Sequence, residues 1–95
     1  TAEPDPSLIK LLAKAHALQD KILHSNGLTL DAIARRERIS GSYFTRLLRL
    51  AYLAPDITKA ILYGRQPYDL TAAKLLRESR LPLDWPAQRR ALGFT

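Results

Sequence analysis

The stretch from residue 29 to residue 53 constrains the fold most, because it carries two short apolar stripes at helical spacing. The first stripe should turn Leu30, Ile33 and Ala34 toward a core. The residues of the second stripe that should face the same core are Phe44, Leu47, Leu48 and Ala51. This pattern predicts two helices joined by a tight turn, with Thr29 or Asp31 as the N-cap of the first and the second at about 41–53.

The helical period leaves a polar face on the second of these helices. The polar residues expected on it, or at its start, are Ser40, Ser42, Thr45, Arg46 and Arg49, and Tyr43 falls between the polar and apolar faces. Hydroxyl groups can contact base edges or phosphates, and arginine can pair with O6 and N7 of guanine. The arrangement is typical of a helix-turn-helix, whose second helix enters the DNA major groove.

The distribution of charge favours the same partner. The net charge is +6, from 15 basic and 9 acidic residues. Residues 1–27 sum to zero, whereas residues 28–53 carry five arginines and two acids, a balance of +3. Three of the arginines, Arg35, Arg36 and Arg38, form a basic run that is either a solvated helix end or a set of contacts with DNA phosphates.

A further helix is predicted ahead of this unit. Residues 1–6 contain two prolines and two acids and are expected to be a leader or the end of a linker. Ser7 is the expected N-cap, and Asn26-Gly27 the expected stop. The apolar positions between them recur every three or four residues: Leu8, Leu11, Leu12, Ala15, Leu18, Ile22 and Leu23. His16 and His24 have no second ligand at a suitable spacing, and we interpret both as surface or packing residues.

Three more helices are predicted after residue 53, at about 55–63, 71–79 and 84–93. Gly64 should end the first, Thr71 should cap the second through about Ser79, and Asp84 should cap the last. The residues expected inside are Ile57, Ala60, Ile61, Leu62, Ala72, Leu75 and Leu76, and Trp85 is expected to pin the last helix to the body. No alternating apolar run exceeds four residues. The prediction is an all-α fold, a compact bundle of about five to six helices forming one domain at 7–95.

Several classes of function lack their sequence signals. The chain has no cysteine, which excludes disulfides and thiolate metal sites. It contains no Gly-rich phosphate loop, no HExxH motif and no serine beside a histidine at nucleophile spacing. No apolar run approaches the ~18 residues that a membrane span needs. We expect a cytoplasmic, nucleoid-associated protein that is no enzyme and has no cofactor, metal or small-molecule ligand.

The segment at 30–76 resembles the helix-turn-helix core of ParB/KorB-type partition and repressor proteins. The matching features are AIARRERISGSYFTRLLRL and, after Gly64, a helix opening at LTAAKLL. The resemblance implies that the second helix gives specificity and that the following helices pack behind it and help to contact DNA. Where glycine and leucine are common in that turn, this chain has Arg38 and Glu37. The first helix could therefore run on, with the turn at Ser40-Gly41.

A longer phrase is similar to the C-terminal segment of bacterial serine recombinases of the resolvase/invertase class. It reads LRLAYLAPDITKAILYGRQPYDLTAAKLLRESRLPLDWPAQRRALGF. The similarity covers roughly residues 8–94 and is most specific from Leu47 onward. It implies a catalytic resolvase domain, with the nucleophilic serine, on the N-terminal side. An excised domain would also explain the absence of methionine.

Three functions stay open at this point. The first is a DNA-binding domain of a site-specific recombinase, acting on double-stranded DNA beside the crossover site. The second is a fragment of a partition protein or transcriptional repressor with the same DNA-binding surface. The third is a helical protein–protein module that uses the apolar first helix as its interface. Self-association through the parent protein is compatible with each of them.

Overall fold

The structure, a computed structural model, describes residues 3–77 and 81–94. Within these two ranges it contains six α-helices and no strand, which confirms the predicted all-α class. The helices are α1 (Pro6–Leu23), α2 (Leu30–Arg36), α3 (Gly41–Leu50), α4 (Pro55–Leu62), α5 (Ala72–Arg77) and α6 (Trp85–Leu92). None of these helices combines the length and hydropathy needed to cross a membrane.

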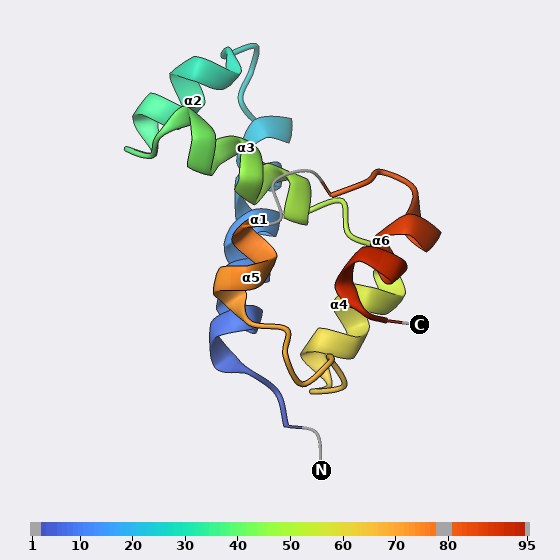
Figure 1. Cartoon of the computed structure of the whole chain (residues 1–95). Helices are drawn as coiled ribbons and strands as arrows, with labels where there is room; N and C mark the ends of the chain where they lie inside the picture. The colour runs from blue at the N-terminus through green and yellow to red at the C-terminus, as the bar shows by residue number, and fades with distance from the viewer. Residues whose placement is uncertain (1–2, 78–80, 95) are drawn as a thin grey trace.

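Helix α1 forms the spine of the molecule (Figure 1). Its buried residues are Leu8, Leu11, Leu12, Ala15 and Leu18, which pack in one core with residues of the later helices. Helices α3, α4 and α5 contact it directly, and α2 and α3 form one end of the molecule (Figure 1). Most of the apolar face of α1 is thus buried inside the chain.

The beginning of α1 differs from the prediction. The side chain of Asp5, not of Ser7, caps the helix, because Oδ1 of Asp5 accepts the backbone N–H of Ser7 at 2.9 Å. The preceding residues, Glu3 and Pro4, pack on the turn after α4. Gly64 has a φ of +72° there, and a Cβ at this position would collide with the backbone of both residues. Glu3 and Pro4 thus pack on the helical body, and Asp5 and Pro6 form the start of α1.

Helix α1 ends at Leu23, with His24 as its C-cap, before the predicted stop at Asn26-Gly27. The predicted starts of the later helices are confirmed. Four N-cap side chains accept a backbone N–H from the first turn of their helices: Thr29, Ser40, Thr71 and Asp84. Asp31, the alternative cap of α2, lies within that helix. Gly93, in the left-handed conformation with a φ of +82°, ends α6 as predicted. The predicted extension of the fifth helix to Ser79 lies outside the described residues.

Four apolar side chains do not follow the prediction. Leu23, one of the predicted apolar positions of the first helix, is the last residue of α1 and is 73% exposed. Leu30 and Leu62, predicted inside, are 51% and 48% exposed, because they are the first residue of α2 and the last of α4, where no neighbouring helix covers them. Leu50, absent from the predicted set, is 1% exposed and continues the buried row of Phe44 and Leu47 at intervals of three. Helix α3 ends at this residue, three positions before the predicted end at residue 53.

An amide, rather than the tryptophan, fastens the last helix. Trp85 is 48% exposed, whereas Gln88 is only 1% exposed. Oε1 of Gln88 accepts the buried N–H of Ala54 at 2.8 Å. Its Nε2 donates to the carbonyl oxygens of Tyr52 and Pro82 at 3.2 and 2.8 Å. One side chain of α6 thus satisfies two backbone groups in the connection from α3 to α4 and one just before α6 itself.

We expect Gln88→Leu to lower the free energy of unfolding by about 3 kcal/mol, because it leaves a buried N–H and two carbonyls without their partner. Urea denaturation followed by circular dichroism measures the change. Gln19→Leu, at a half-buried position on α1, is the matched control and should change stability by less than about 0.5 kcal/mol. A Gln88→Leu protein as stable as the wild type would contradict the assigned role.

A second contact joins α6 to α4. Nε and Nη2 of Arg89 donate to Oδ2 and Oδ1 of Asp56 at 2.7 and 2.8 Å, a bidentate pair. These hydrogen bonds, together with the charge of the guanidinium, hold the pKa of Asp56 below its ordinary value of 3.8 and raise the pKa of Arg89. The pair lies at the surface, with side chains 58% and 33% exposed, so its contribution to stability is modest.

The lowered pKa of Asp56 predicts a pH dependence of stability. A carboxyl whose folded pKa lies below its unfolded pKa stabilises the fold above the unfolded value, and this stabilisation is lost as the pH falls through the folded value. The urea midpoint of the wild type should therefore fall between about pH 5 and pH 2. Asp56→Asn should remove part of that fall and leave the rest of the profile unchanged. Identical profiles for the two proteins would show that the pair does not form in solution.

Candidate functional site

Helices α2 and α3 are joined by residues 37–40, where the sequence predicts the turn. Arg38 has a φ of +60°, in the left-handed region. Its N–H donates to the carbonyl of Arg35, and the N–H of Ile39 donates to that of Ala34, both at 3.1 Å. This pair of bonds is a Schellman motif, which closes the C-terminus of a helix. Helix α2 therefore stops at Arg36, and the alternative of a longer helix turning at Ser40-Gly41 is wrong.

Arginine occupies the position in this motif that glycine normally takes, so we expect opposite effects of glycine at two nearby positions. Arg38→Gly should raise the free energy of unfolding by about 0.5–1 kcal/mol, because relief of left-handed strain exceeds the added entropy of the unfolded chain. Arg36→Gly, at the last residue of α2, where the backbone is still helical, should lower it by up to about 1 kcal/mol. Urea denaturation of both variants checks the signs. A loss of stability for Arg38→Gly would contradict the strained conformation.

Glu37 ties the turn to α1. Its Oε1 accepts a hydrogen bond from Nζ of Lys21 at 2.6 Å, and the two side chains are 28% and 55% exposed. Such surface pairs add little to stability, but this one joins elements 16 residues apart in sequence. Glu37 thus has a positional role, since it connects the turn to α1.

The exposed face of α3 forms one continuous polar stripe. Its members are Ser42, Thr45, Arg46 and Arg49, which are all exposed and are spaced at i, i+3, i+4 and i+7. The opposite face, with Phe44 and Leu47, is buried against the core. The structure therefore places these four predicted residues on one surface. We call this set of four the α3 stripe.

Two hydroxyl groups at the start of α3 already have backbone partners. Oγ of Ser40 accepts the N–H of Tyr43 at 3.1 Å, so this side chain serves first as the helix cap. Oγ1 of Thr45 donates to the carbonyl of Gly41 at 2.9 Å. The hydroxyl hydrogen of Thr45 is therefore already engaged, while Ser40 keeps a hydroxyl hydrogen to donate.

Tyr43 lies beside two lysines, Lys14 and Lys21, that the sequence analysis did not include in the candidate site. It is half-buried and lines a hollow of about 290 Å³ together with Lys14 and Lys21 of α1. These lysines lie seven residues apart and so share one flank of α1. That spacing is visible in the sequence, but only the packing of α1 against α3 shows that this flank borders α3.

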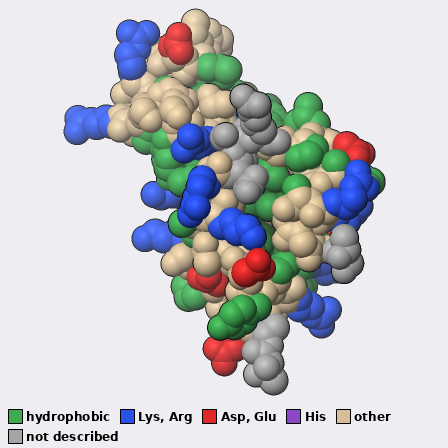
Figure 2. Space-filling model, viewed as in Figure 1, with side chains coloured by type: hydrophobic (Ala, Val, Ile, Leu, Met, Phe, Trp, Pro, Cys, Tyr) green, Lys and Arg blue, Asp and Glu red, His purple; other side chains and the backbone are tan. Residues whose placement is uncertain are grey.

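The basic run at 35–38 does not form a single surface. Arg35, Arg36 and Arg38 are all exposed. Arg36 lines a hollow of about 370 Å³ beside His24 and Leu28, at the end of α1 rather than along the α3 stripe. Nε of Arg35 is 3.5 Å from the carbonyl of Asp31, back along α2. Figure 2 shows lysine and arginine side chains projecting from the α2–α3 end and down the left flank, with an acidic side chain among those at the top.

The described part of the chain contains no group of three or more histidine, cysteine or acidic residues that could hold a metal ion. His24 bonds locally, with Nδ1 2.8 Å from the carbonyl of Asp20. The candidate site is the exposed α3 stripe, which carries hydrogen-bond donors and positive charge.

Comparisons of the chain with protein-family models, with curated proteins and with solved structures give no match. The resemblances to partition proteins and to serine recombinases stay predictions.

Proposed function

We propose that this chain binds double-stranded DNA, with α2 and α3 acting as a helix-turn-helix and α3 lying in the major groove. The observation that supports this most is the α3 stripe: hydroxyl residues near the helix start and two arginines further along, all exposed, on a helix whose opposite face is buried. A ten-residue helix is about 15 Å long, which suits a groove about 12 Å wide.

The residues of the stripe would have distinct roles. Arg46 and Arg49 can each pair with guanine O6 and N7 or grip a phosphate. Ser42, in the first turn, can contact a phosphate near the positive end of the helix dipole. Thr45 can place its methyl group against the methyl group of a thymine, because its hydroxyl hydrogen is bound to the backbone.

The flanks of α3 would add contacts with the DNA backbone. Lys14 stands beside Tyr43 on one flank, next to the ion pair of Lys21 with Glu37, and Arg38 is exposed in the turn that leads into α3. Positive side chains beside a recognition helix, such as Lys14 and Arg38, can fix its position on the duplex without reading sequence. Arg35 and Arg36 would contribute mainly through their long-range charge.

The test is a fluorescence-anisotropy titration of a labelled 20-base-pair duplex at several salt concentrations. Arg46→Ala with Arg49→Ala should weaken binding at least about tenfold, because two direct DNA contacts are lost. The slope of log K against log salt should become shallower by about 2, as two phosphate neutralisations disappear.

The matched control is the double variant Arg65→Ala with Arg90→Ala, which removes the same charge from exposed positions outside α2 and α3. It should keep most of the affinity. Circular dichroism of both double variants confirms that they fold. Equal affinity for the stripe variant and the wild type would show that α3 is not the DNA-binding helix.

We further propose that this domain is part of a site-specific DNA recombinase. A location at the nucleoid would follow from DNA binding. The support is the similarity of the stretch from Leu47 to Phe94 to the C-terminal segment of serine recombinases. The gene sequence upstream of Thr1 is the decisive observation. A resolvase catalytic domain there would support this class, whereas a partition or repressor domain would support the alternative that uses the same DNA-binding surface.

A further inference from the structure

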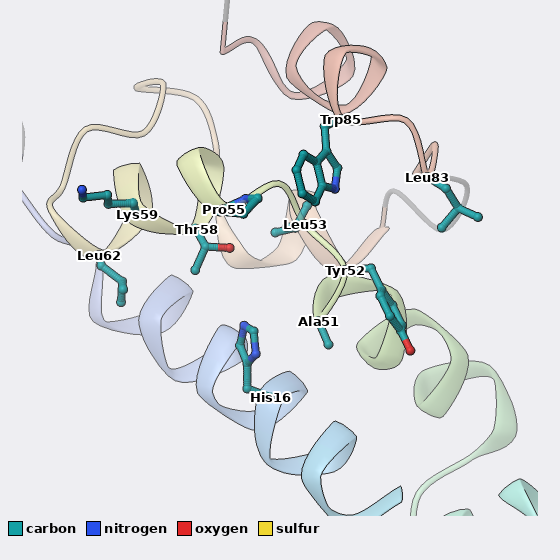
Figure 3. Close-up of a pocket in the computed structure, with 10 residues that line it drawn as sticks. All are labelled: His16, Ala51, Tyr52, Leu53, Pro55, Thr58, Lys59, Leu62, Leu83 and Trp85. Atoms are coloured by element: carbon teal, nitrogen blue, oxygen red, sulfur yellow. The ribbon is translucent and has the colours of Figure 1, made fainter. Parts of the chain in front are cut away.

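A large hollow lies where α1, the connection from α3 to α4, helix α4 and the start of α6 meet (Figure 3). Its volume is about 690 Å³, and none of its lining residues belongs to the α3 stripe. The apolar part of the lining includes Tyr52, Leu53, Pro55, Leu62, Leu83 and Trp85. Small-molecule sites typically measure about 300–1,000 Å³ and have walls of this kind.

The large apolar side chains around this hollow are unusually exposed. Trp85 and Leu62 are each 48% exposed, and Leu83 is 79% exposed. Single exposed apolar residues are common on protein surfaces, but several around one concavity indicate a binding surface. In Figure 3 the indole of Trp85 extends from the start of α6 toward Leu53 and Pro55, so it forms a wall of the hollow.

The polar groups of the lining favour an anion. They include the imidazole of His16 and the hydroxyl of Thr58, Lys59 brings a positive charge to the edge, and none of the ten lining residues is acidic. Figure 3 shows the His16 ring rising from α1 into the hollow, the Thr58 hydroxyl turned toward Pro55, and Lys59 at one edge with its exposed chain extending outward. A carboxylate can accept hydrogen bonds from all three kinds of donor.

We propose that this hollow binds a small apolar carboxylate, with an aromatic or branched body against Trp85 and the carboxylate toward His16, Thr58 and Lys59. Charge complementarity disfavours a second copy of the chain as the occupant, because docking would bring together two molecules of net charge +6. This inference does not depend on DNA binding. It differs from the expectation that the chain binds no small-molecule ligand. The sequence alone did not show this hollow, because its lining comes from three segments that are far apart in the chain.

Trp85 is the only tryptophan of the chain, so its fluorescence reports directly on the hollow. The experiment titrates the full chain with 4-phenylbutyrate, excites the indole at 295 nm and follows its emission. Uncharged 4-phenylbutanamide is the matched probe. We expect saturable binding of the acid and binding of the amide at least about threefold weaker, as expected for one exposed charge contact.

Two variants distinguish binding in the hollow from nonspecific binding of the acid to a positively charged protein. Lys59→Gln should weaken binding of the acid by about threefold and leave binding of the amide unchanged. Lys10→Gln removes an exposed lysine of α1 that does not line the hollow, and should bind the acid as the wild type does. Amide-proton NMR should show that 4-phenylbutyrate shifts residues 51–53 and 58–62 most.

Three results would overturn the proposal. One is an absence of saturable binding. Another is equal affinity for the acid and the amide, which would show that the hollow does not recognise the carboxylate. The third is a dimer in sedimentation whose dissociation changes the Trp85 emission, because a second copy would then occupy the hollow.

Discussion

The packing of α1 against α3 is the contact on which the rest of the structure depends. Leucines of α1 and the row of Phe44, Leu47 and Leu50 bury one another, and burial of each such side chain stabilises the fold by roughly 1.5–3 kcal/mol. Once this face of α3 is inside, its helical period forces the polar residues outside. Helix α2 contacts the body mainly through α3, and the bond from Lys21 to Glu37 fixes the turn between them. The geometry of the candidate DNA surface therefore follows from the hydrophobic core.

Features determined by neighbours in sequence were predictable, and those determined by distant neighbours were not. Caps such as Thr29 and Asp84 need only a polar side chain and the next turn of helix, so they were predicted. Exposure of Leu30 and Leu62 depends on which helices stop short of them. The role of Gln88 depends on backbone groups 34 and 36 residues away, which no local pattern contains. Helical starts and faces are local properties, whereas burial at helix ends is a property of the whole packing.

The same distinction applies to the candidate site. The α3 stripe was predicted because a single helix period separates its residues from the buried ones. Lys14 and Lys21 were missed because they lie on another helix and border the site only through packing. Arg38 shows an intermediate case. The sequence showed that Arg38 stands where glycine is common in such a turn, but not where the helix ends. Two backbone hydrogen bonds, which define the Schellman motif, show that α2 ends just before it.

The position of Gln88 also bears on how the domain is assembled and how it can be divided. The residues that lead out of α3 bond to a side chain supplied by the last helix, so the exit of α3 closes only when nearly the whole chain is present. Contacts of such sequence separation form late in folding, because a long loop must close first. A fragment that ends after the turn and α3 would keep the proposed recognition sequence but lose the bonds that hold its exit. The smallest piece able to present α3 in this geometry therefore extends at least to Gln88.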